Sequence, residues 1–287
     1  MADGNKIARL LLEAASTVAR ASSARAIVVP IDALPEINTV PIKTILVARE
    51  AADHDRIAQL EEPPLSVLDV PNVELDRLGQ VKLAAIIGLS TRTIDLHDSV
   101  VFLTGPYRSL IDSMVVMSLG IEYELFDTTD QPDIDEHIKR AVFHRVLSLA
   151  LNIGQHGREG KRVGTLLVVG DTRTVLEHTD QMILNPFKGY AEHERNILAD
   201  GMSETIREYA ALDGAFVVRG NGVIETAGAR LRAGLSPGLA GLGARHAAAA
   251  GITAKTRCIA FTVSESDGTV RVWRAGKMLA SFEPTRR

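Results

Sequence analysis

Ser99-Val100-Val101-Phe102-Leu103-Thr104 decides the fold that we predict for the first half of the chain. Its middle is continuously apolar, and it ends at the turn-forming pair Gly105-Pro106. Three similar stretches precede it, at residues 26–30, 44–48 and 66–70. Strands that are apolar on both sides are typical of parallel sheets that helices cover on both faces. We therefore expect these four segments to form one parallel sheet.

Helical segments separate the predicted strands. Residues 7–21 carry apolar side chains at helical spacing, and Asp76 is a suitable N-cap for a helix that begins after it. Another helix is expected over residues 110–117, after the Gly105-Pro106 turn. Because crossovers between parallel strands are right-handed, this order predicts an open, doubly wound α/β domain, which we place at residues 1–128.

The second half of the chain predicts a mixed-sheet α/β domain over residues 134–287. The polar segment 127–133 is the expected linker between the two domains. Hairpin turns imply antiparallel pairs, whereas the apolar segment 163–169 is typical of a buried strand. The expected helices are 134–152, 197–212 and 247–250 (the last ending at Gly251), and the expected hairpins join 215–218 to 222–226 and 256–263 to 269–274.

Composition excludes several classes of function. The chain has 287 residues, a net charge of -4 and a pI near 6.1, so no basic surface for nucleic acid or for a membrane is expected. No apolar run is long enough to span a bilayer, and the N-terminus does not follow a signal-peptide pattern. The single cysteine, Cys258, lies beside apolar residues and is expected to be a buried strand residue. We expect a cytoplasmic protein.

Glycine motifs narrow the options further. No Gly-x-Gly-x-x-Gly follows the first strand, and no phosphate-loop motif occurs. We therefore expect no dinucleotide site in the first domain. In the second domain, Asp213-Gly214 follows an apolar helical segment. Asp-Gly is a common turn, but a carboxylate at a helix C-terminus is disfavoured by the helix dipole, and a metal-binding role would compensate for that cost.

Gly243-Ala244-Arg245-His246 opens an alanine-rich helical segment. A glycine turn before a helix presents free N–H groups and the positive end of the helix dipole, where a phosphate binds well. Arg245 can add a bidentate contact and His246 a further donor. Further along, Ser264 can contact a phosphate and Glu265 can join Asp213 at a metal. Each short motif alone is more often structural: a capped helix, a surface arginine, a packed histidine or a solvated loop.

Read in order, these motifs resemble the diadenylate cyclase domain, also called the DAC or DisA-type domain. The resemblance covers about residues 134–284. The first half looks like the domain, similar to the C-terminal part of pyruvate kinase, that precedes the cyclase domain in archaeal members. The segments that carry the resemblance are Asn185–Tyr190, Leu212–Ala215, Gly228–Leu231, Gly243–Ala249, Val263–Gly268 and Ala275–Leu279.

The resemblance implies that two ATP molecules condense to cyclic di-AMP and two pyrophosphates, with Mn²⁺ or Mg²⁺ as cofactor. Each site would hold one ATP, so the sites of a homodimer, or of a pair within a larger homo-oligomer, would face each other. The implied metal ligands are Asp213 and Glu265, and the implied catalytic residues are Asp213, Arg245 and His246. The implied nucleotide-binding residues are Gly214, Ala215, Leu231, Gly243, Ala244, Arg245, His246, Ser264 and Glu265.

Two positions depart from the pattern of bacterial members. Ala247 stands where a second arginine is usual, and Ala244 stands where a threonine is usual. The phosphate site therefore has one cation and one hydroxyl fewer, for which Lys255 or Arg257 would be a compensating cation. The alternatives are a catalytically silent sensor that binds ATP or cyclic di-AMP, and an oligomeric scaffold in which Asp213 and Arg245 are structural.

Overall fold

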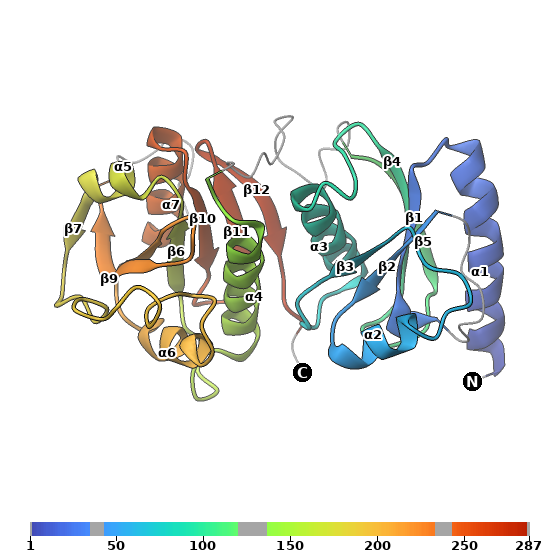
Figure 1. Cartoon of the computed structure of the whole chain (residues 1–287), viewed down its shortest axis with the longest axis horizontal. Helices are drawn as coiled ribbons and strands as arrows, with labels where there is room; N and C mark the ends of the chain where they lie inside the picture. Colours follow the sequence, from blue (N-terminus) through green and yellow to red (C-terminus); the bar gives the residue numbers. More distant parts are fainter. Residues whose placement is uncertain (1, 35–42, 120–136, 233–242, 286–287) are drawn as a thin grey trace. The chain divides into compact units, whose positions relative to one another are not determined.

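The computed structural model describes residues 2–34, 43–119, 137–232 and 243–285. The chain divides into two compact units, residues 1–125 and 126–287. Each unit has its own sheet and its own hydrophobic core (Figure 1). Within the described ranges, no helix combines the length and the apolar character needed to cross a membrane. The expected linker at 127–133 lies outside the described residues.

The first unit is built on a five-stranded sheet with the order β3-β2-β1-β4-β5. The first four strands along the chain are parallel, as predicted, and β5 runs antiparallel to β4. Because the chain crosses from β3 back to β4 on the other side of β1, the strand order reverses between β1 and β4. The strands are β1 (Ala26–Pro30), β2 (Thr44–Ala48), β3 (Ser66–Asp69), β4 (Ser99–Thr104) and β5 (Ser113–Ser118).

Helices cover both faces of this sheet, which is why its central strands are apolar throughout (Figure 1). Helix α1 (Ala2–Ala21) packs against β1 and β4, and α3 (Arg77–Ser90) packs against β3 and β4 from the other side. The predicted cap is confirmed, because the Asp76 side chain accepts a hydrogen bond of 2.6 Å from the Gly79 amide. The remaining elements are the short helices η1 (Ile31–Ala33) and α2 (Ala51–Ile57).

The helix predicted over residues 110–117 is wrong, because residues 113–118 form β5 and residues 110–112 precede it without helical structure. Leu110, Met114 and Met117 have helical spacing, but Val115 and Val116 are β-branched and favour a strand. Strand β5 pairs with the free edge of β4 along its whole length, from Ser99 opposite Ser118 to Thr104 opposite Ser113. The backbone hydrogen bonds with β4 therefore favour a strand in a segment whose sequence fits a helix and a strand almost equally well.

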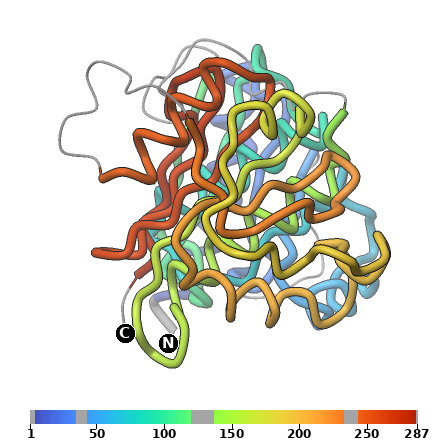
Figure 2. The backbone as a smooth tube through the Cα atoms, turned by 90° about the vertical axis from the view of Figure 1, so that its left-hand side faces the viewer, coloured from blue at the N-terminus to red at the C-terminus, as the bar shows by residue number. Residues whose placement is uncertain are grey.

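The second unit has a seven-stranded mixed sheet with the order β12-β11-β10-β6-β8-β9-β7. Strands β6 and β8 are parallel and the other neighbours are antiparallel, as predicted for a mixed sheet. The last three strands, coloured red, lie side by side in Figure 2. The strands are β6 (Thr165–Val169), β7 (Thr179–Gln181), β8 (Ala215–Val218), β9 (Ile224–Leu231), β10 (Ile259–Val263), β11 (Val270–Arg274) and β12 (Lys277–Phe282).

Two helices cover opposite faces of this sheet. Phe143 of α4 (Arg140–His156) packs on Phe261 with ring centroids 5.5 Å apart. Ala249 of α7 (Ala244–Lys255) lies in the core cluster that includes Ala260. Because residues 260 and 261 are neighbours in β10, their side chains point to opposite faces, and so the two helices do as well. The shorter helices are α5 (Thr172–Glu177) and α6 (Met202–Tyr209).

The boundaries of four predicted helices are wrong. Helix α1 begins at Ala2 rather than at residue 7, and α4 begins at Arg140 rather than at residue 134 and continues past Asn152 to His156. The segment 197–212 is helical only over α6, which begins after Gly201 in a left-handed conformation, with φ of 77°. Helix α7 begins three residues before the predicted start and continues beyond Gly251 to Lys255. It continues because Ile252 and Thr253 are both buried, so packing outweighs the modest cost of one glycine inside a helix.

Candidate active site

A cleft of about 850 Å³ opens in the second unit at the N-terminus of α7, a volume typical of small-molecule sites. It is formed where the start of β8, the end of β9, the first turns of α7 and the β10–β11 turn meet. All the site residues predicted from the sequence line it: Asp213, Gly214, Ala215, Leu231, Gly243, Ala244, Arg245, His246, Ser264 and Glu265.

Gly214 allows β8 and β9 to approach closely beside Asp213. Its φ is +105°, and a Cβ there would lie 2.6 Å from the Ala229 amide nitrogen. The Asp213 side chain is 83% exposed, so its carboxylate is open to the cleft. Helix α6 ends at Tyr209, which places Asp213 in the turn before β8. The helix-dipole conflict inferred from the sequence therefore does not occur.

The N-terminus of α7 faces the cleft with Gly243 as its N-cap. Gly243 has an extended ψ of 171° and no side chain, so no side-chain cap covers the first turn. The His246 amide donates to the Gly243 carbonyl at 3.0 Å, whereas the amides of Ala244 and Arg245 have no partner within the helix. This arrangement leaves donors and the positive end of the helix dipole available to an anion.

Arg245 links the two carboxylates of the site. Its Nη2 lies 3.5 Å from Asp213 Oδ1, and its Nη1 lies 3.1 Å from Glu265 Oε2. The Arg245 side chain is 29% exposed and the Glu265 side chain is 64% exposed, so the three groups remain accessible to solvent and to a ligand. Gly164, just before β6, makes room for the guanidinium, because a Cβ there would lie 2.6 Å from Arg245 Nη1.

His246 is buried on the inner side of the same turn. Its Nε2 lies 3.0 Å from Arg271 Nη1, and its ring meets Trp273 edge-on at 6.1 Å. Trp273 is fixed in turn by a hydrogen bond of 3.0 Å from Nε1 to the hydroxyl of Thr262. Burial, together with the positive charges of Arg271 and Arg245, lowers the pKa of His246 against the opposing effect of Asp267. The imidazole is therefore neutral at pH 7.

Ser264 follows β10 and begins the turn to β11. Its amide donates to the Thr269 carbonyl at 2.9 Å, and its hydroxyl lies 3.0 Å from the Ser266 hydroxyl. The turn is compact because Gly268 has a φ of +77°, which lets its amide donate a hydrogen bond of 3.0 Å to the Ser264 carbonyl. This geometry presents Ser264 and Glu265 together at the edge of the cleft.

The donor set of the cleft suits a metal that arrives with its substrate. Mg²⁺ is usually held by one or two carboxylates together with substrate phosphates and water. Asp213 and Glu265 supply two carboxylates that approach the same guanidinium. Among the residues that the structure describes, no three His, Cys, Asp or Glu side chains gather into a preformed metal site.

The structure brings in residues that sequence reasoning missed. Met182 extends the apolar lining, and Arg271 adds a cation. Arg271 could have been found from the alternation of Val270, Arg271 and Val272, which puts Arg271 on the opposite face of β11 from the two valines.

The compensating cation inferred from the sequence was wrong. Lys255 ends α7, eleven residues after its first residue, or about 16 Å along the helix axis from the cleft. The Arg257 amide donates to Asp171 at 2.9 Å, outside the residues that line the cleft. In the described part of the chain, the cationic side chains that line the cleft are Arg230, Arg245 and Arg271.

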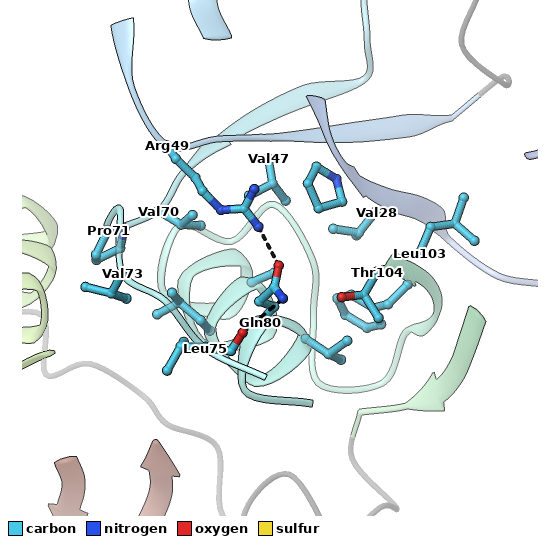
Figure 3. Close-up of a pocket in the computed structure, with 15 residues that line it drawn as sticks. Val28, Val47, Arg49, Val70, Pro71, Val73, Leu75, Gln80, Leu103 and Thr104 are labelled. Carbon is cyan, nitrogen blue, oxygen red and sulfur yellow. Dashed lines mark hydrogen bonds between the residues drawn. The ribbon is translucent and has the colours of Figure 1, made fainter. Parts of the chain in front are cut away.

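The first unit has a much smaller cavity at the carboxyl ends of β1, β2 and β4 (Figure 3). Its volume is about 20 Å³, enough for a single water molecule. Arg49 pairs there with Asp32 and donates to Gln80 Oε1 at 2.7 Å. The Thr104 hydroxyl is buried without a hydrogen-bond partner among the residues that the structure describes, which suits one bound water. This cavity is too small to hold a nucleotide.

Two family profiles match the chain. Residues 152–278 match the family described as "DisA bacterial checkpoint controller nucleotide-binding". Residues 8–126 match the family described as "Probable sensor domain DacZ_P". Both matches agree with the resemblance seen in the sequence, including the domain that precedes the cyclase domain in archaeal members.

Relatives and a solved structure extend this comparison. "Diadenylate cyclase" of Methanocaldococcus jannaschii is 31% identical over 260 residues, covering 88% of this chain and 81% of that protein. "Diadenylate cyclase" of Haloferax volcanii is 30% identical over 196 residues, covering 67% and 70%. The crystal structure of DacA from Staphylococcus aureus is similar at 23% identity and a TM-score of 0.32, covering 48% of this chain and 84% of that one. The chain belongs to the diadenylate cyclase family of nucleotidyltransferases.

Proposed function

We propose that the second unit condenses two ATP molecules into cyclic di-AMP and releases two pyrophosphates. The observation that carries this proposal is the position of Arg245 between Asp213 and Glu265, at the open N-terminus of α7. One cleft thus combines carboxylates for a metal with a cation and free amides for a triphosphate. Phosphoryl transfer depends mainly on such positioning and charge neutralisation.

Each side chain of the cleft has a role in this reaction. Arg245 and the open amides of α7 hold the triphosphate, and Ser264, which also lines the cleft, contacts it. Neutral His246 donates a hydrogen bond to a phosphate oxygen. Leu231, whose side chain is buried at the cleft wall, packs against the adenine. Gly214, Ala215, Gly243 and Ala244 have small side chains or none, so the nucleotide approaches the backbone closely.

Asp213 and Glu265 hold the divalent cation, Mn²⁺ or Mg²⁺, together with the phosphates. A cation held there would supply charge neutralisation at the phosphates and would favour ionisation of the attacking 3′-hydroxyl. The exposed Asp213 carboxylate is also placed to accept the proton of that hydroxyl. Bond formation joins the 3′-oxygen to the α-phosphorus, and pyrophosphate leaves with the bonding electron pair.

A second copy of the chain completes the reaction, because each cleft holds one nucleotide and the product needs two. An exposed apolar run, Met182–Leu184, extends outward from the wall of the cleft, and the Leu184 side chain is 95% exposed. An apolar run of this kind beside a half-complete site suits an isologous two-fold contact. The homodimer, or a larger homo-oligomer, would bring two clefts face to face through this run.

The Met182–Leu184 run gives this part of the proposal its own test. Leu184→Glu should weaken self-association and slow product formation, while each cleft still binds ATP. Leu65→Glu is the matched control, because Leu65 is an exposed leucine of the first unit, 49% exposed. Sedimentation velocity and isothermal titration calorimetry would measure both properties, and a Leu184→Glu protein that stays dimeric would contradict the assignment of this surface.

A catalytically silent sensor of ATP or cyclic di-AMP is the second candidate function. The observation that favours it is the small size of Ala244 and Ala247, which leaves the first turn of α7 with one cation and no hydroxyl. The third interpretation, a scaffold, is not supported by the exposure of Asp213 and Glu265, because structural ion pairs are usually less exposed.

The deciding experiment is incubation of the purified protein with ATP and either Mn²⁺ or Mg²⁺, followed by chromatography for cyclic di-AMP. Product with one of the metals is the expected result. Binding of ATP without product under either metal would leave the sensor as the function.

A cytoplasmic location remains a prediction, which cell fractionation would test.

A further inference from the structure

We propose that Arg271 is a positioning residue for the cyclase reaction, which holds His246 as the neutral imidazole with its proton on Nδ1. This inference rests on the proposed function for its catalytic meaning, but the tautomer itself is a property of the free protein. The geometry that carries it is the contact of 3.0 Å between Arg271 Nη1 and His246 Nε2.

The placement of Arg271 follows from the alternation of β11. Arg271 and Trp273 are two residues apart in the strand, so their side chains leave the same face of the sheet. Trp273 lies in the core cluster under α7, which identifies this as the α7 face. His246, in the first turn of α7, contacts both side chains. The sheet therefore presents the guanidinium to one edge of the imidazole while the indole meets the ring.

The direction of the hydrogen bond fixes the tautomer. A guanidinium has five N–H donors and no acceptor, so Nε2 of His246 must be the acceptor. A neutral imidazole that accepts at Nε2 carries its proton on Nδ1, which makes Nδ1–H its one remaining donor. Protonation of Nε2 would place two cationic groups in contact and would break the hydrogen bond. Arg271 thus opposes the imidazolium both by charge and by geometry.

The surrounding charges agree with this direction. The groups that act on His246 are Arg271 on β11, Arg245 on α7 and Asp267 in the β10–β11 turn. Burial is the largest influence, the two arginines act in the same direction, and Asp267 acts against them. A bound triphosphate would add negative charge, which would favour protonation of an imidazole that lacked the contact with Arg271. Arg271 lets the nucleotide bind without proton uptake at His246, so the imidazole stays a neutral donor.

Arg271 also supplies a cation that is missing at position 247, where this chain has Ala247 instead of the arginine usual in bacterial members. The first turn of α7 has only Arg245 as a cation, but β11 brings a second guanidinium into contact with His246. Arg245 from α7 and Arg271 from β11 thereby both act on this imidazole. Their positions are fixed by a helix and a strand, so neither depends on a loop conformation.

The test is long-range ¹H–¹⁵N NMR of the His246 ring in the full-length free protein, as a function of pH. Wild type should show Nδ1 protonated and Nε2 unprotonated at pH 7. Arg271→Met, which removes the donor and the charge at similar volume, should raise the protonation constant of His246 about 10-fold, a shift of one pKa unit. Arg271→Lys should restore most of the wild-type value, because it keeps the charge.

Arg230→Met is the matched control, since Arg230 also lines the cleft but pairs with Asp180 at 3.1 Å. It should leave the His246 titration unchanged. Calorimetry of ATP binding in buffers of different ionisation enthalpy should show no proton uptake for wild type at pH 7 and uptake for Arg271→Met. In turnover assays, Arg271→Met should lower kcat more than it raises KM and should shift the acidic limb of the pH profile upward.

Two results would overturn the assignment: a proton on Nε2 in the wild-type protein, or an unchanged His246 titration in folded Arg271→Met. If Arg271→Met fails to fold, Arg271→Lys and the wild-type tautomer still decide the question. The NMR measurement requires no turnover, so an inactive wild-type protein would contradict the proposed function without touching this result.

Discussion

Arg49 in the first unit and Arg245 in the second unit are both paired with carboxylates, but their surroundings differ. The Arg49 side chain is 5% exposed, its partner Asp32 is 17% exposed, and the cavity beside them has a volume of about 20 Å³. Arg245 is 29% exposed, its partner Asp213 is 83% exposed, and the cleft measures about 850 Å³. The first pair is enclosed by the fold, whereas the second lies open to a ligand.

This difference separates structural from functional charge. Breaking a buried ion pair leaves an uncompensated charge inside the protein and is strongly destabilising. Breaking an exposed pair changes stability little, since water replaces the partner. Asp213 and Glu265 can therefore exchange Arg245 for a ligand at little cost in stability, whereas Asp32 is needed to stabilise the folded first unit. The comparison predicts opposite consequences for equivalent substitutions in the two units.

Asp213→Asn should have the largest effect on function and almost none on stability. Loss of a metal-binding carboxylate should slow cyclic di-AMP formation roughly 10³-fold, about 4 kcal/mol in activation free energy. The melting temperature should stay within about 2 °C of wild type, because the side chain is exposed. Product formation by chromatography and a thermal melt measure the two quantities, and near-normal turnover would refute the metal assignment.

Asp32→Ala should show the reverse pattern. Removing the partner of buried Arg49 should lower the free energy of unfolding of the first unit by about 3 kcal/mol. The affinity of the folded protein for ATP should not change, because Asp32 lies in the first unit. Chemical denaturation and calorimetry would check this, and a protein that is as stable as wild type would show that the Arg49 pair is not structural.

Gly214→Ala should destabilise the second unit by about 2 kcal/mol, through its positive φ and its close approach to the β9 backbone. Gly201→Ala is the matched control, with φ of +77° but no atom within 4 Å of the added Cβ. It should cost about 1 kcal/mol, which is the conformational part alone. Equal losses of stability in denaturant titrations would mean that the close approach of β8 and β9 does not matter.

Acid should weaken the second unit by a smaller amount than Gly214→Ala. The pKa of His246 is lower in the folded protein than in the unfolded chain, because of burial and then of Arg271. The unfolded chain therefore binds more protons as the pH falls below about 6.5, and unfolding becomes easier. His246→Asn should flatten this dependence in denaturation measurements between pH 7 and pH 5. An unchanged slope would contradict the buried neutral state.

Cys258 should give the smallest effect, an absence of reactivity. Burial is the main reason that its pKa is raised to about 12, so the thiolate is scarce at pH 8. A thiol reagent should label the native protein only as fast as it unfolds, and labelling should be immediate in denaturant. Rapid labelling under native conditions would show that the edge of the core near β10 opens readily.

The sequence predicted most of the central elements because their signals are local and strong. The apolar strands of the first unit match β1, β2 and β4 residue for residue, and Asp76 caps α3 as expected. Strand β5 was predicted wrongly because its pairing with β4 is a tertiary effect that local spacing does not contain. The short elements α2, α5 and β7 have too few residues to produce a clear period.

For the site, the motifs predicted which residues line the cleft, but not how they contact one another. Arg245 and Asp213 are far apart in sequence, and Gly164 leaves room for the Arg245 guanidinium that pairs with Asp213. Arg271 was missed because a lone arginine on a strand carries no motif. The inferred cation Lys255 was wrong since helical rise, and not sequence proximity, sets its distance from the first turn of α7.

Trp273 is the single tryptophan of the chain, and it lies against the imidazole of His246. Its fluorescence therefore comes from one place, beside His246, with no other indole to dilute the signal. A charged imidazolium quenches a neighbouring indole more strongly than a neutral imidazole does, so emission intensity should report the protonation of His246. The native chain thus contains its own optical probe, and nucleotide binding can be followed in unlabelled protein.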